Sequence, residues 1–244
     1  MIKKVLLGIG AVVGVAVVGV LGAAATQPDV VHVERSLVVA AQPGDIQPHI
    51  NDLKKFSAWN PWGQMDPLQK VTHSEPSAGL GARYDWSSEL VGTGSMTITK
   101  SEPEAVHMRL VFTAPWQSEA DANFLLKPEG EQTTVTWTYD QQADFGTKLM
   151  GLAMNMDSML GPDYEKGLAS LKVIAEQAAT ARKAAEAQAE ADAKAAAEAQ
   201  AAAQAPADGD EAGEAAAAAA EDARPDEAPA GKAGKGKGGK AKKG

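Results

Sequence analysis

Large apolar side chains alternate with polar ones through most of the middle of this chain. Ala82, Tyr84 and Trp86, for example, alternate with Arg83 and Asp85. A period of two places one set of side chains on each face of a strand. The pattern predicts strands at residues 31–39, 69–74, 82–86, 96–98, 106–112, 122–126 and 135–139. Such alternation is typical of an antiparallel sheet with one buried and one solvated face, so we expect seven antiparallel strands.

Between the first two predicted strands, the sequence indicates a short helix and a loop. Asp45 is placed to cap a helix at residues 46–53, and Pro48 then falls in its first turn, where a missing N–H costs little. Residues 56–62 combine aromatic side chains with a proline. We expect this segment to form a loop.

After the last predicted strand, apolar residues recur at helical spacing through residues 149–160. The Gly161-Pro162 pair is expected to interrupt this helix, and Pro162 suits the first turn of a second helical segment. Because one sheet cannot bury its inner face alone, the terminal helix must lie across it. The order of elements therefore predicts an α+β domain at residues 27–175.

The N-terminal segment, residues 1–26, differs from the domain. Residues 5–25 carry no charge, and a helix of that length extends about 30 Å, the hydrocarbon thickness of a bilayer. Lys3 and Lys4 favour a cytoplasmic N-terminus and an exported domain, periplasmic or extracellular. We therefore predict a single-pass transmembrane anchor. A cleaved signal peptide is the alternative, because the alanines at 23–25 fit an A-x-A cleavage site.

The C-terminal part of the chain is low in complexity. Residues 176–205 consist of alanine with charged and amide side chains, which are strong helix formers, and should extend the terminal helix into solvent. This segment lacks Leu, Ile and Val, so a coiled coil is not expected. Residues 206–244 are rich in Gly, Pro, Ala and charge, which predicts a disordered tail with a lysine-rich basic terminus.

Composition narrows the chemistry of the domain. Residues 26–175 hold 19 acidic and 11 basic residues, a poor composition for binding a phosphate backbone, so no nucleic-acid partner is expected. The absence of cysteine removes thiolate nucleophiles and Cys-type zinc sites. The four histidines show no metal-ligand spacing, and the paired glycines at 79/81 and 92/94 precede strands, as in hairpin turns. We predict neither a metal nor a cofactor, and identify no catalytic residue.

The large apolar side chains are the candidate ligand-binding residues. All Trp, Tyr and Phe residues lie between Phe56 and Tyr164. Flat aromatic walls and adaptable methionines suit apolar ligands, and the methionines near residues 150–159 favour a ligand-facing wall on the terminal helix. Ordinary core packing is the alternative for each residue. The candidates are Trp59, Trp62, Met65, Tyr84, Trp86, Met96, Met108, Trp116, Phe124, Trp137, Met150 and Met154.

Five segments carry a family resemblance: residues 33–43, 50–62, 65–67, 92–99 and 161–172. In combination they resemble the SRPBCC superfamily, which includes START and polyketide cyclase/dehydrase-like proteins. Bacterial members of this kind often carry an N-terminal hydrophobic segment. The resemblance covers about residues 30–175. It implies a helix-grip fold, in which a curved antiparallel sheet wraps around a long C-terminal helix and encloses a hydrophobic cavity.

The resemblance implies binding of a lipid, sterol, polyketide or other hydrophobic molecule, and some members catalyse cyclisation or hydration. No catalytic set is shared across the superfamily. We expect membrane-tethered binding of a hydrophobic small molecule or lipid in the cavity. The alternatives are an enzyme, such as a cyclase, hydratase or hydrolase of a polyketide-like substrate, and a protein interaction module. Four carboxylates near the expected cavity mouth are interpreted as solvated loop charges: Asp66, Asp85, Glu89 and Asp144.

Overall fold

The computed structural model describes residues 2–204 of the 244-residue chain. The first helix is α1 (Ile2–Ala25). Its stretch Gly8–Ala25 is long and apolar enough to cross a membrane, and a signal sequence would share these properties. The expected disordered tail, residues 206–244, lies outside the described residues.

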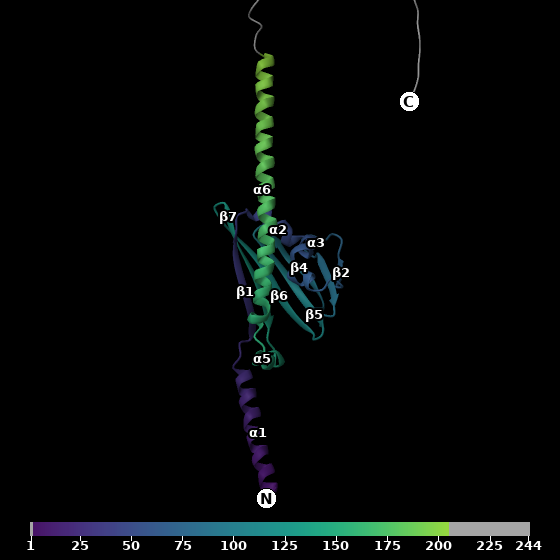
Figure 1. Ribbon diagram of the computed structural model, residues 1–244, viewed down its shortest axis with the longest axis vertical. Coiled ribbons are helices and arrows are strands. Elements are labelled where there is room, and N and C mark those ends of the chain that lie inside the picture. Colours follow the sequence, from purple (N-terminus) through teal and green to yellow (C-terminus); the bar gives the residue numbers. More distant parts are fainter. Residues whose placement is uncertain (1, 205–244) are drawn as a thin grey trace, which may run out of the picture. The chain divides into compact units, whose positions relative to one another are not determined.

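Seven strands form one antiparallel sheet in the order β1-β7-β6-β5-β4-β3-β2 (Figure 1). The predicted number of strands and their antiparallel arrangement are confirmed. β1 pairs with β7, so the first and last strands are neighbours, and β2 forms one edge. The strands are β1 (Val30–Val39), β2 (Lys70–His73), β3 (Arg83–Ser88), β4 (Gly92–Glu102), β5 (Ala105–Ala114), β6 (Ser118–Glu129) and β7 (Gln132–Gln142).

The strand register defines two ends of the sheet. Ser88 is paired with Gly92, and Val30 with Gln142, so the β3–β4 loop, the β5–β6 loop, the start of β1 and the end of β7 share one end. We call it the proximal end, because residues 26–29 join α1 to β1 there. The opposite, distal end holds the β2–β3 loop and the tight β4–β5 and β6–β7 turns.

Three short helices follow β1: α2 (Pro43–Asn51), α3 (Leu53–Trp59) and α4 (Pro61–Met65). The first begins earlier than predicted, so Pro48 lies in its interior and not in its first turn. The prediction of a loop at residues 56–62 is wrong, because this segment forms the end of α3 and the start of α4.

Side-chain caps explain why this segment is helical. The Asp52 carboxylate accepts a hydrogen bond from the backbone N–H of Lys54 at 3.0 Å and so begins α3. The Asn60 side chain likewise accepts from the backbone N–H of Gly63 at 2.8 Å and begins α4. Pro61 fits the first turn of α4, where no N–H donor is needed. The Asn-Pro pair therefore starts a new helix.

Two helices follow β7: α5 (Phe145–Gly151) and α6 (Met156–Gln204). The interruption comes earlier than predicted, because Asn155 Oδ1 accepts from the backbone N–H of Ser158 at 3.1 Å and α6 begins there. α6 then continues through Gly161 and Pro162, the pair predicted to interrupt it. It also includes the alanine-rich segment as far as residue 204, and its part beyond Asp192 is exposed and belongs to a separate unit.

α6 packs against the inner face of the sheet beside β1 (Figure 1). Near the start of the helix, the Arg35 guanidinium forms ion pairs with Asp157 at 2.7 Å and Glu165 at 2.9 Å. Further along, the Lys172 amine donates to the backbone oxygen of Val38 at 2.9 Å. Because residue numbers rise in the same direction on both elements, α6 runs from the proximal to the distal end.

Buried aliphatic side chains fill the distal half of the space between the sheet and the helices. They come from α2, α3, the distal halves of β4 to β7, and α6. Fully buried members include Ile46, Ile50, Leu53, Ile98, Val106, Leu126, Val135, Leu168 and Leu171. The proximal half is packed differently, with aromatic and methionine side chains.

Gly167 allows α6 to approach the sheet closely. A β-carbon at this position would lie 2.7 Å from Cζ3 of Trp137 and 3.2 Å from Cδ of Pro61. We expect Gly167→Ala to lower the free energy of unfolding by about 1–3 kcal/mol, because the Trp137 ring must move. Chemical denaturation of the detergent-solubilised chain measures this effect.

Ala169, an exposed residue of α6, shows what the exchange of glycine and alanine does to stability where no close packing is involved. Ala169→Gly should cost about 1 kcal/mol, the intrinsic helix propensity difference. Propensity alone would therefore make Gly167→Ala stabilising. A stabilised Gly167→Ala variant would contradict the close packing between α6 and Trp137.

Candidate functional site

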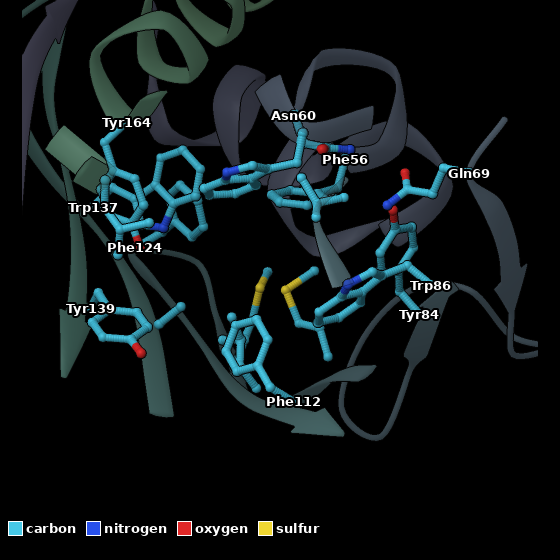
Figure 2. A pocket seen from close by; sticks show the side chains of 17 residues that line it. Phe56, Asn60, Gln69, Tyr84, Trp86, Phe112, Phe124, Trp137, Tyr139 and Tyr164 are labelled. Atoms are coloured by element: carbon cyan, nitrogen blue, oxygen red, sulfur yellow. The ribbon is translucent and has the colours of Figure 1, made fainter. Parts of the chain in front are cut away.

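A cavity of about 210 Å³ lies in the proximal half of the domain, between the inner face of the sheet and helices α3, α4 and α6. Figure 2 shows Phe124, Trp137 and Tyr164 on one side of the hollow, and Tyr84 and Trp86 on the other. The strands contribute side chains at alternate positions, as the period-two pattern requires. The cavity therefore occupies the inner face of β3 to β7.

Stacked aromatic rings form the rigid wall of the cavity. The Trp137 ring stacks on Tyr164 with centroids 3.9 Å apart, and on Phe124 with centroids 4.7 Å apart. Trp62 meets Trp137 edge to face at 5.7 Å. Phe56 packs edge to face against Phe124 at 6.4 Å. Such contacts fix the ring positions, so this wall is preformed.

The cavity opens at the proximal end. Met108, Phe124 and Trp137 line its inner part and are buried. The half-buried lining residues Val91 and Phe112 lie in the β3–β4 loop and near the end of β5, both proximal. Because the distal half of the domain is filled by aliphatic side chains, the less buried part of the cavity lies between these proximal segments.

The polar groups that line the cavity are neutral. The Tyr139 hydroxyl donates to Gln141 Oε1 at 2.8 Å, and burial raises the pKa of Tyr139 to about 12. Burial also raises the pKa of Tyr84 and of Tyr164, so these phenols stay protonated at neutral pH. Among the described residues that line the cavity, none carries a carboxylate, imidazole or amine. The lining therefore suits an uncharged ligand.

Trp137 holds a buried donor without a partner. Its side chain is 2% exposed and lines the cavity, and its Nε1–H meets no hydrogen-bond acceptor among the described residues. The indole of Trp59, in contrast, donates to the backbone oxygen of His49 at 2.9 Å. A buried donor that lacks an acceptor costs free energy, so a ligand or water oxygen next to Trp137 would be stabilised.

The structure brings seven of the twelve candidate ligand-binding residues together at the cavity. They come from α4 and from strands β3 to β7. These residues are Trp62, Tyr84, Trp86, Met96, Met108, Phe124 and Trp137.

The other five candidates lie elsewhere. Trp59 is buried in the core behind the cavity wall. Met65 is exposed at the end of α4, and Trp116 is 69% exposed in the β5–β6 loop. Met150 and Met154 are exposed in α5 and in the segment that leads to α6. The structure therefore does not place the predicted methionine wall at the cavity, because α6 begins only after these residues.

Several cavity residues were absent from the sequence-based candidates. Tyr139, Phe112 and Leu110 share a strand face with residues that were chosen, so alternation alone could have found them. The helical periodicity of α6 could likewise have indicated Tyr164 and Leu160. The remaining ones are Phe56, Asn60, Gln69, Val91 and Ala122. Gln69 and Val91 lie in loops, where no periodicity indicates direction.

The four carboxylates predicted as solvated loop charges differ in environment: Glu89 is exposed in the β3–β4 loop, whereas Asp85 lies within β3 and not in a loop. Asp85 pairs with Arg83 at 2.7 Å, and Asp144 caps α5 by accepting from Thr147 N–H, which lowers the pKa of Asp144. The prediction is wrong for Asp66, because this residue is buried and its carboxylate accepts a hydrogen bond from the Ser88 hydroxyl. It fixes the α4–β2 loop against the end of β3.

Comparison with protein families matches residues 30–176 to the family described as polyketide cyclase / dehydrase and lipid transport. None of the curated proteins compared with the chain matches it. The chain is similar to the solved Aha1 dimer from Colwellia psychrerythraea, with 18% identity, 60% of this chain and 96% of that chain covered, and a TM-score of 0.45.

Two further solved structures show similarity. The Zhui aromatase/cyclase from Streptomyces sp. R1128 has 17% identity over 61% of this chain and 94% of its own, with a TM-score of 0.43. A hypothetical protein from Helicobacter pylori has 11% identity over 62% and 90%, with a TM-score of 0.47. The family match covers more than half of the chain and includes every strand of the sheet and the start of α6. This chain therefore belongs to the polyketide cyclase / dehydrase and lipid transport family, within the SRPBCC superfamily that its sequence resembles.

Proposed function

We propose that the domain binds a compact, uncharged hydrophobic molecule in its proximal cavity and holds it at a membrane to which α1 tethers the chain. The observation that carries the proposal is the aromatic and methionine cavity, which is preformed, open at one end and lined by neutral groups. Such a cavity gains affinity from apolar burial.

The size of the cavity limits the ligand. An apolar cavity of about 150 Å³ holds benzene. The volume of about 210 Å³ therefore suits one or two fused rings, or the end of a longer apolar molecule whose remainder extends through the mouth. A whole membrane lipid would exceed this space.

The Trp137 indole, whose N–H has no acceptor among the residues that the structure describes, suggests which polar group the ligand carries. Its Nε1–H would donate to a carbonyl, ether or hydroxyl oxygen placed against the cavity wall. Binding is favoured over catalysis because the described residues of the lining include no group that ionises near neutral pH and could act as a general acid or base. We therefore infer a ligand with one or a few oxygens on an apolar ring system.

A matched pair of probes tests this inference. 1-Tetralone and tetralin share a bicyclic frame and differ in one carbonyl oxygen. Replacing Trp137 with phenylalanine should lower the affinity for 1-tetralone about fivefold more than that for tetralin, because one hydrogen bond of about 1 kcal/mol is lost. Equilibrium dialysis of the full chain in nanodiscs, with empty nanodiscs as the partition reference, measures both affinities.

The comparison of probes separates the hydrogen bond from packing. Phenylalanine removes ring volume as well as the donor, and this change affects both probes. Equal losses for the two probes would show that Trp137 acts through packing or holds a water. Failure of the wild-type chain to bind either probe would contradict the proposed function itself.

A further inference from the structure

Large apolar side chains are exposed in separate segments at the proximal end. They come from the segment before β2, from the β3–β4 and β5–β6 loops, and from α5 with its connection to α6. We call them the proximal rim: Leu68, Leu90, Trp116, Phe145, Met150 and Leu152. Single exposed apolar residues are common, but their gathering at one end of a domain marks a surface that contacts something apolar.

The end of α5 and its connection to α6, residues 152–155, strengthen this observation. Residues 149–156 contain no charged side chain, and Leu149, Met150, Leu152 and Met154 are all 39–44% exposed. Chain connections that face water are ordinarily polar. This one presents leucine and methionine instead, so its surroundings are expected to be less polar than bulk water.

The rim surrounds the mouth of the cavity. Val91 and Phe112 line the mouth of the cavity. Val91 directly follows the rim residue Leu90, and Phe112 lies near the end of β5, just before the loop that carries Trp116. Leu160, another lining residue, lies near the start of α6, four residues after the end of this uncharged stretch. Whatever covers the rim therefore also faces the opening of the cavity.

Chain connectivity places the rim beside the end of α1. The Asp29 backbone oxygen accepts from the N–H of Ala143 at 2.9 Å, and its carboxylate pairs with Lys148 of α5 at 2.5 Å. Asp29 is the fourth residue after Ala25, the last residue of α1, so the two Cα atoms lie at most about 14 Å apart. If α1 crosses a bilayer, the proximal end lies at its surface.

We propose that the proximal rim docks on the bilayer that holds α1, so that the cavity opens into lipid. This inference rests on the tether in the proposed function. The acidic residues Glu89 and Asp144 directly precede the rim residues Leu90 and Phe145, and the nearby cation Lys148 is paired with Asp29. The contact of the rim with the membrane is therefore apolar insertion into the interface, where Trp116 suits the aromatic belt, and not attraction to anionic headgroups. Ligand passes between membrane and cavity without crossing water.

The absence of cysteine allows a direct test. Leu90→Cys, Trp116→Cys and Leu152→Cys each introduce one thiol at the rim. Leu80→Cys is the matched control, because Leu80 is 73% exposed at the distal end and Leu90 is 74% exposed at the proximal end. Each full-length variant is labelled with an environment-sensitive NBD fluorophore and reconstituted into phosphatidylcholine vesicles.

We expect the three rim labels to emit at shorter wavelength than the Leu80 label and to lose most of their emission when spin-labelled lipids are added. The effect should persist at high salt. The docking proposal would be overturned if the rim labels emitted at the same wavelength as the Leu80 label. It would also be overturned if their emission were shifted to shorter wavelength but not quenched by the spin-labelled lipids. Flotation after alkaline washing reports the tether separately: a chain that floats with water-exposed rim labels refutes docking alone, and a chain that does not float refutes both.

Discussion

Replacing Leu110 with tryptophan is expected to lower the affinity of the cavity for 1-tetralone about 100-fold. Leu110 is half-buried on β5 and lines the cavity. The larger ring takes space that the ligand needs. Displacing three or four methylene-sized groups from apolar contact loses about 2.4–3.2 kcal/mol. Equilibrium dialysis of the full chain in nanodiscs measures the affinity.

Val111 provides the matched control for this substitution. It is also half-buried and follows Leu110 on the same strand, but alternation points its side chain to the opposite face of the sheet. Val111→Trp should leave the affinity within about twofold, since the cavity is unchanged. If both variants bind as well as the wild type, the probe binds outside this cavity.

Replacing Phe124 with alanine is expected to lower the free energy of unfolding by about 3–5 kcal/mol. Phe124 is fully buried and stacks on Trp137, and it meets Phe56 and Trp59 edge to face at 6.4 and 6.0 Å. The loss is a large part of the roughly 5–15 kcal/mol that stabilises a typical domain. Chemical denaturation followed by tryptophan fluorescence measures it.

The same substitution at an exposed phenylalanine is the control. Phe145 lies on α5 and is half-exposed, so Phe145→Ala should change stability by no more than about 0.5 kcal/mol. Similar losses at the two positions would mean that the aromatic wall does not stabilise the fold. A stable Phe124→Ala variant would also show that the cavity wall is less rigid than its stacked rings indicate.

The sheet could be predicted from the sequence because its two faces differ in polarity. Tyr84 and Trp86 alternate with Asp85 and Ser87, and the observed strand follows this pattern. The helices on either side of Asn60 were harder to predict, because an Asn-Pro pair fits a loop and the start of a helix equally well. Only the hydrogen bond from Gly63 to the Asn60 side chain distinguishes the two.

The cavity could be predicted only in part, because strand periodicity indicates the buried face of a strand but not which buried residues line a cavity. Periodicity tells which face of a strand is buried, so Met96, Met108 and Phe124 were assigned to the inner face. It cannot tell how far along the sheet the packed core gives way to a cavity. It also cannot place a residue in a loop. Trp116 was therefore selected although it is exposed at the rim, and Gln69 was not selected although it lines the cavity.

Native mass spectrometry of the full chain tests the central claim most directly. The chain is incubated with 1-tetralone in nanodiscs and released in the gas phase, beside the Leu110→Trp variant. At the same 1-tetralone concentration, the proposed cavity predicts mainly chains with one bound 1-tetralone for the wild type and mainly bare chains for the variant. A wild-type chain at its bare mass, or equal occupancy of the two chains, would contradict the proposal that this cavity binds hydrophobic molecules.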